Sequence, residues 1–127
     1  MTQKAILPTQ RQRLLRWGFW SLLLAVVVLS LLPTSYLPPQ AFSLWDKAQH
    51  ALGFLALGLL GQAAYPSQRI PLWLALLTVG GAIELAQAAT GWRYGEWADW
   101  LADALGLLAA PAMQTLWPAR HRAPTQP

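Results

Sequence analysis

The sequence predicts an all-α fold, an integral membrane bundle of four transmembrane helices. Three observations support this prediction: few residues are charged, four long apolar runs are present, and basic residues flank the first and last runs. Only 11% of the 127 residues are charged and 55% are hydrophobic, whereas soluble domains carry about 25% charged residues. No segment alternates apolar and polar residues as a half-buried strand does, so we expect no strands.

The first apolar run covers residues 14–32 and is followed by Pro33. Because basic residues precede it, a cleaved signal peptide is an alternative to a first membrane span. The run is longer than the apolar region of a signal peptide, and no A-x-A cleavage site follows it. We therefore expect an uncleaved span after a cytoplasmic basic N-terminus of residues 1–13.

The other three apolar runs follow at short intervals, at residues 48–64, 71–90 and 97–117. Each is near the roughly 20 residues that a helix needs to cross the hydrocarbon core, the second being the shortest. Pro71 stands at a helix start, where proline is tolerated, and Gly91 stands just past the helix end. Pro111 is expected to kink the last helix. Glycines in these three runs permit close approach of the helices.

Basic residues predict the orientation, because cytoplasmic flanks of membrane proteins are enriched in Lys and Arg. Those near the two ends of the chain are Lys4, Arg11, Arg13, Arg16, Arg120 and Arg122. We expect both termini and the loop at residues 65–70 to be cytoplasmic, in a bacterial inner membrane. Residues 14–117 then form the membrane domain, and residues 118–127 form a basic, Pro-containing cytoplasmic tail.

Ionisable residues lie near one end of three of these runs. Glu84 is six residues before the end of the third run, and Asp103 is six residues into the fourth. At about 1.5 Å per residue, both lie roughly 9 Å below the outer boundary. His50 is two residues into the second run, directly after Asp46 and Lys47. The three helices thus bring polar groups to the same level.

Helical spacing groups these residues further, because residues three or four positions apart share a face. Such a face inside a bilayer should point to the bundle interior or to a water-filled cavity, since an acid near the centre of a span costs about 2.5–3.5 kcal/mol. We predict one outward-facing polar site. Its members are Asp46, Lys47, His50, Glu84, Gln87, Arg93, Asp99 and Asp103.

The formal charge of this region is negative. With Glu96 it contains five carboxylates and two cations, which leaves −3 if His50 is neutral. Either some carboxyls stay protonated, or a bound cation or a protonated His50 supplies the balance. Lys47 and Arg93 lie near the rim, where they could contact an anionic headgroup or a carboxylate.

Three segments, taken in order, resemble a known family: "DKAQHALGFLALG", "ELAQ" and "RYGEWADWLADALG". They look like the VanZ-like membrane protein pattern, which has D-K-x-x-H, then E-x-x-Q, then an Arg six positions before an Asp, then N-x-x-G. The matching residues are Asp46, Lys47, His50, Glu84, Gln87, Arg93, Asp99 and Gly106. The resemblance covers about residues 44–110. Asp103 stands where the family usually has Asn.

Structural roles are an alternative for several of these residues. Asp46 is an ordinary residue at a helix start, and Glu84 could fasten helices through a bond to Arg93 or His50. His50, Glu84, Asp99 and Asp103 suit Mn, Zn or Mg only loosely and have no H-E-x-x-H spacing. We therefore expect no metal and no cofactor. The chain has no cysteine, and its serines lie in no nucleophile motif.

The leading functional hypothesis is a cell-envelope membrane protein, not an enzyme, that binds an amphiphile or a peptide-bearing headgroup at the outer leaflet. The resemblance implies a link to glycopeptide resistance, because the family includes a protein linked to teicoplanin resistance. A membrane hydrolase or transferase that uses the buried carboxylates is an alternative, and a structural or proton-responsive accessory subunit is another. Beyond the lipid bilayer and such a cell-wall-precursor ligand we name no partner. Nucleic acid is not expected, because the chain shows no basic face with interleaved aromatic residues.

Overall fold

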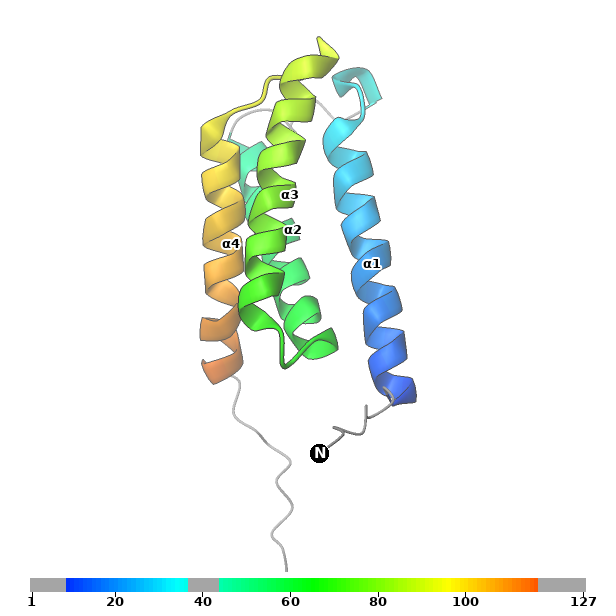
Figure 1. The fold of residues 1–127 in the computed structure, drawn as a ribbon. Helices are drawn as coiled ribbons and strands as arrows, with labels where there is room; N and C mark the ends of the chain where they lie inside the picture. Colours follow the sequence, from blue (N-terminus) through cyan, green and yellow to red (C-terminus); the bar gives the residue numbers. More distant parts are fainter. Residues whose placement is uncertain (1–8, 37–43, 117–127) are drawn as a thin grey trace, which may run out of the picture.

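The computed structural model describes residues 9–36 and 44–116, which form four α-helices and one short 3-10 helix. The elements are α1 (Gln10–Leu31), η1 (Thr34–Tyr36), α2 (Leu44–Ala64), α3 (Arg69–Thr90) and α4 (Trp97–Leu116). Successive helices run in opposite directions along the bundle (Figure 1). The described residues contain no strand, so the all-α prediction is confirmed.

The helices begin up to four residues earlier than predicted. Thr9 caps α1, where its hydroxyl accepts a hydrogen bond from the backbone N–H of Gln12 at 3.3 Å. Asp46 lies in the first turn of α2, where a carboxylate favours the helix dipole. Gly91 ends α3 in the left-handed conformation with φ 78°, as predicted. Helix α4 continues through Pro111 to Leu116.

Some of the terminal predictions fall outside the described residues. Residues 1–8 and 117–127 are among those not described, and they include Lys4, Arg120 and Arg122. The basic N-terminus is therefore described only from Thr9, and the Pro-containing tail lies wholly outside the described part of the chain.

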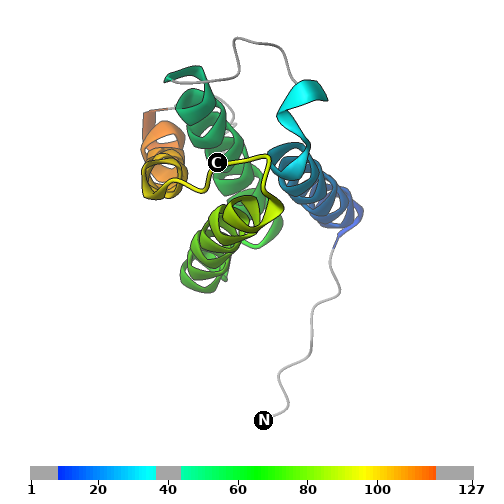
Figure 2. The same ribbon diagram turned by 90° about the horizontal axis from the view of Figure 1, so that it is seen from above.

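Helices α2 and α3 each pack against the other three helices, and the contact between α2 and α4 is the most extensive, whereas α1 and α4 are not in contact (Figure 2). The apolar core between the helices is small. Its fully buried large side chains include Phe54, Leu57, Leu76 and Leu107. Glycines bring α2 and α4 close together, as the sequence predicted. A Cβ on Gly106 would collide with the backbone carbonyl of Ala51, and one on Gly58 would lie 2.9 Å from Ala110.

Beside this apolar core the described bundle also buries several charged groups, which are seldom buried in a soluble protein. Seven polar or charged side chains are buried: His50, Gln62, Glu84, Gln87, Arg93, Asp99 and Asp103. Many large apolar side chains are exposed, and in α1 only Phe19 is buried. By length and composition, α1 and α3 are able to cross a membrane. Among the described residues, α2 and α4 are not apolar enough over a membrane-spanning length to be counted with them.

The close approach of α2 and α4 predicts a large difference between two glycine substitutions. Gly106→Ala should destabilise the bundle by about 1–3 kcal/mol, because the new methyl group forces the two backbones apart. Gly81→Ala is the control, since its Cβ would meet only the Trp100 ring, at 3.7 Å, and alanine favours the helix. Thermal unfolding of the purified protein in detergent measures both. Equal midpoints for the two variants would contradict this packing.

Candidate functional site

The eight residues predicted to form a polar site lie together at one end of the bundle. This is the end where α1 and α3 finish and where α2 and α4 begin (Figure 1). Six of the eight side chains are buried, and Asp46 and Lys47 are half-buried. Seven of the eight form three neighbouring groups, and Asp46 lines a cavity beside them.

The first group joins three helices through His50 of α2, Glu84 of α3 and Asp103 of α4. The Nδ1 atom of His50 lies 3.0 Å from Asp103 Oδ1 and 3.9 Å from Glu84 Oε1. Asp103 is completely buried. Its other oxygen, Oδ2, lies against Gly80 of α3, where a Cβ would approach it to 2.8 Å. The similar depth of these residues, predicted from the sequence, thus corresponds to a direct contact.

Several oxygen atoms of this region have no hydrogen-bond partner among the described residues. They are Glu84 Oε1, Asp103 Oδ2 and Gln87 Oε1, all buried. A buried acceptor without a donor costs about 1–3 kcal/mol. The two carboxylate oxygens are therefore suited to a proton or a cation, which agrees with the negative formal charge counted from the sequence.

The second group is an ion-pair cluster at the rim. Lys47 Nζ lies 2.8 Å from Glu96 Oε2 and 2.9 Å from Asp99 Oδ1. Lys47 precedes the predicted span at residue 48, and the hydrogen bonds that its ammonium group donates to Glu96 and Asp99 raise its pKa above the ordinary value. The sequence predicted that Lys47 could contact an anionic headgroup or a carboxylate. In the structure, two carboxylates of this chain bind its ammonium group.

Sequence reasoning left Glu96 out of the site. It is linked to the buried group as well, because its backbone N–H donates to Glu84 Oε2 at 2.8 Å. This bond joins the loop between α3 and α4 to the end of α3. The position of Glu96 directly before Trp97, the first residue of α4, is a signal that could have identified it, since acids favour helix N-termini.

The third group fastens the end of α1. Gln87 Nε2 and Arg93 Nε both donate to the backbone carbonyl of Ser30, at 2.9 Å and 3.1 Å. Ser30 is in the last turn of α1, where carbonyls have no partner within the helix. Trp92 Nε1 donates to the next carbonyl, that of Leu31, at 3.3 Å. No pattern of side chains predicts that Ser30 belongs to the site, because it takes part through its backbone carbonyl.

A cavity of about 280 Å³ opens beside these groups, between α1 and α2. Its lining residues are Val26, Leu29, Ser30, Asp46, Gln49, His50 and Arg93. The wall from α1 is mainly apolar, whereas α2 and the α3–α4 loop contribute a carboxylate, an amide, an imidazole and a guanidinium. Burial raises the pKa of Asp46, although the positive charge of Arg93 opposes this shift. The cavity thus presents both signs of charge beside an apolar wall.

Two overlapping sets of residues have donor atoms close enough together to hold a cation. One set is Asp46, His50 and Asp99, and the other is His50, Glu84 and Asp103, with donor atoms within 4.8 Å of one another in each. The sequence analysis had weighed His50, Glu84, Asp99 and Asp103 as a loose metal set, and these four include all of the second set and two members of the first. One nitrogen with carboxylate oxygens suits several divalent ions without selecting one.

Comparison of the chain with known protein families, with curated proteins and with solved structures gave no match. The resemblance to VanZ-like proteins therefore rests on the motif residues themselves. All the motif residues lie at the polar end of the bundle, from Asp46 to Gly106.

The contact between His50 and Asp103 predicts different outcomes for two substitutions. Asp103→Asn should be tolerated, because the amide oxygen still accepts a hydrogen bond from His50. Asp103→Ala should destabilise the bundle by about 1–3 kcal/mol, because it leaves a buried imidazole without its partner. Thermal unfolding in detergent distinguishes them. If Asp103→Asn loses as much stability as Asp103→Ala, the negative charge, and not the hydrogen bond, is what His50 requires.

Proposed function

We propose that this chain is a VanZ-like protein of the bacterial cytoplasmic membrane, with four spans and both termini in the cytoplasm. In this proposal it binds the headgroup of an envelope amphiphile at the outer leaflet. The observation that carries the binding function is the cavity lined by Asp46, His50 and Arg93 on one side and by apolar residues of α1 on the other.

The buried charged side chains and the exposed large apolar side chains together support the four-span membrane embedding. Helix α1 exposes Leu14, Trp17 and Leu24 and buries only Phe19, so most of its apolar surface needs an apolar surrounding. Helices α2 and α4 have a lower hydropathy, yet His50, Asp99 and Asp103 are buried inside the bundle. The surface of α4 instead presents six large apolar side chains: Trp97, Trp100, Leu101, Leu105, Leu108 and Met113. Ionisable residues inside and apolar residues outside are typical of a membrane bundle.

The lining of the cavity favours a zwitterionic headgroup. Arg93 would bind a phosphate or carboxylate, because a guanidinium has five N–H donors. Among the described residues, only Ser30 accepts from that guanidinium, and this bond holds it against the cavity wall. Asp46, on the same cavity, would bind an ammonium group. Val26 and Leu29 would contact the adjoining methylene groups. An aminophospholipid and a peptide-bearing cell-wall precursor both share this chemistry.

A membrane hydrolase or transferase is the second candidate, and the geometry of His50 favours it. Its Nδ1 atom is 3.0 Å from Asp103 Oδ1, and the same side chain lines the cavity. A carboxylate that orients an imidazole in this way is the usual arrangement for a general base. In this candidate, His50 would take a proton from water or from a hydroxyl group of the substrate.

The proposed topology predicts which loops are accessible from each side of the membrane. The chain contains no cysteine, so single cysteines report on their own positions. Ser67 and Tyr94 are exposed at opposite ends of the bundle. With a membrane-impermeant maleimide on intact spheroplasts, we expect Tyr94→Cys to be labelled and Ser67→Cys to be labelled only after lysis. Labelling of both from outside, or recovery of the chain in the soluble fraction, would contradict the topology.

The proposed binding site is tested with dihexanoyl phosphatidylethanolamine and the purified protein in detergent, by isothermal titration calorimetry. We expect binding, and we expect Arg93→Gln to weaken it by at least about tenfold, because a charge-assisted hydrogen bond is lost. Asp46→Asn should reduce the preference for this lipid over dihexanoyl phosphatidylglycerol, which has no ammonium group. Arg69→Gln, at the other end of the bundle, is the control.

Unchanged affinity in folded Arg93→Gln protein would exclude the cavity as the binding site. Release of the headgroup by the parent protein but not by His50→Gln would favour the hydrolase.

The family resemblance adds a readout in cells. If the site mediates glycopeptide resistance, expression of the parent chain raises the teicoplanin concentration that a susceptible host tolerates, and expression of Arg93→Gln does not.

A further inference from the structure

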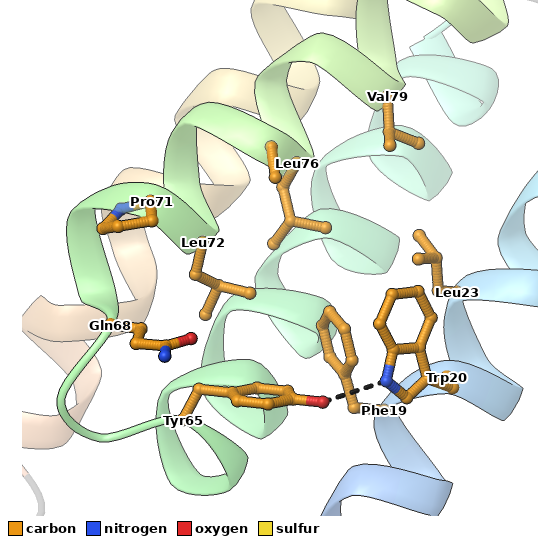
Figure 3. Close-up of a pocket in the computed structure, with 10 residues that line it drawn as sticks. Phe19, Trp20, Leu23, Tyr65, Gln68, Pro71, Leu72, Leu76 and Val79 are labelled. Atoms are coloured by element: carbon orange, nitrogen blue, oxygen red, sulfur yellow. Dashed lines mark hydrogen bonds between the residues drawn. The ribbon is translucent and has the colours of Figure 1, made fainter.

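Two adjoining hollows lie at the opposite end of the bundle from the polar site. The larger has a volume of about 300 Å³ and lies between α1 and α3 (Figure 3). Its walls are mainly apolar, with Phe19 and Leu23 from α1 and Leu72, Leu76 and Val79 from α3. We call this hollow the apolar groove. Its volume and its mainly apolar lining suit a hydrocarbon chain.

The second hollow, of about 260 Å³, is basic and aromatic. It is lined by Arg13, Arg16, Trp17, Trp20 and Tyr65, and we call it the basic hollow. Trp20 and Tyr65 also line the apolar groove, so the two hollows share a wall. A single molecule with a polar head and an apolar tail can therefore occupy both.

The shared wall is held in place by several contacts. Trp20 Nε1 donates to the Tyr65 hydroxyl at 2.9 Å, as Figure 3 shows. Phe19 packs edge-on against both rings, with centroids 5.4 Å and 5.8 Å away. The Arg16 guanidinium lies 4.8 Å from the centre of the Tyr65 ring, and its Nε donates to the Ala64 carbonyl at 3.4 Å. This ordering reduces the entropy lost when a ligand binds.

The charge at this end is uncompensated. All five acidic residues of the chain lie between Asp46 and Asp103, and all five are at or near the polar end of the bundle. Among the described residues, no acidic side chain is therefore available near Arg13 or Arg16. An anionic group bound from outside would supply the missing charge, and a phosphate suits arginine in particular.

We propose that an anionic phospholipid of the cytoplasmic leaflet binds here, with its phosphate at Arg13 and Arg16 and one acyl chain in the apolar groove. Trp17, Trp20 and Tyr65 then lie at the level of the glycerol backbone, where such side chains are enriched. This site goes beyond the headgroup cavity at the other end, and it shares with that proposal only the membrane embedding.

The test uses native mass spectrometry of the full chain in detergent, with dioleoyl phosphatidylglycerol and dioleoyl phosphatidylcholine as probes. We expect the parent protein to retain phosphatidylglycerol in preference to phosphatidylcholine. The double variant Arg13→Gln/Arg16→Gln should lose that preference by about tenfold or more. The control Arg11→Gln/Arg69→Gln removes the same charge near the same end from residues outside both hollows. It should retain the preference.

A second pair of variants tests the apolar groove with both arginines in place. Ala75 lines the groove, so Ala75→Phe should fill it and weaken phosphatidylglycerol binding. Ala112→Phe adds the same ring at an exposed position of α4 that lines neither hollow, and it should leave binding unchanged. These variants separate a lipid with a bound acyl chain from a phosphate group bound alone.

Three results would overturn the proposal. Equal loss in the two arginine double variants would mean general attraction by positive charge. Equal binding of the two lipids by the parent protein would mean that no anionic lipid is selected. A dimer that Ala75→Phe dissociates would mean that a second copy of the chain fills the groove. Arg93→Gln should not change phosphatidylglycerol binding, so failure of this site and failure of the headgroup cavity are distinguishable.

Discussion

The buried contact between His50 and Asp103 is the interaction on which the polar end of the bundle depends. Asp103 is completely buried, and a buried carboxyl group is tolerated only when a partner satisfies it. The contact needs close helices, and glycine provides them at the same level. Gly106, one turn after Asp103, lies against the carbonyl of Ala51, the neighbour of His50. Close backbone packing and the polar pair therefore require one another.

The two ends of the bundle differ in charge, and this difference connects the two binding proposals. The carboxylates are at or near one end, where they partner Lys47 and His50. Near the other end, Arg13 and Arg16 have no acidic neighbour, because the chain has no acid there. A zwitterion matches the first end and an anionic lipid matches the second. The proposed orientation, with the basic end in the cytoplasm, rests on the same asymmetry.

Much of the fold was predictable, because helix formation and depth along a helix are local properties. Apolar runs and their terminating residues predicted four helices, and each observed helix boundary lies within four residues of the predicted one. Counting residues from the span ends placed Glu84 and Asp103 at one level, and they lie near the same imidazole. The members of the candidate site were predictable for the same reason. The partners of these residues were not predictable. The sequence did not show, for example, that Lys47 pairs with Glu96 and Asp99.

The sequence alone thus determined four helices and the level at which each one carries its polar residues. The tertiary structure decided which residues meet: Lys47 with Glu96 and Asp99, and Arg93 with the Ser30 carbonyl. It also produced the cavity and the apolar groove, which no single helix contains. The physical reason is that contacts between helices depend on their rotation and separation. Packing of glycines and large side chains across several helices sets both, and the periodicity of one helix does not specify them.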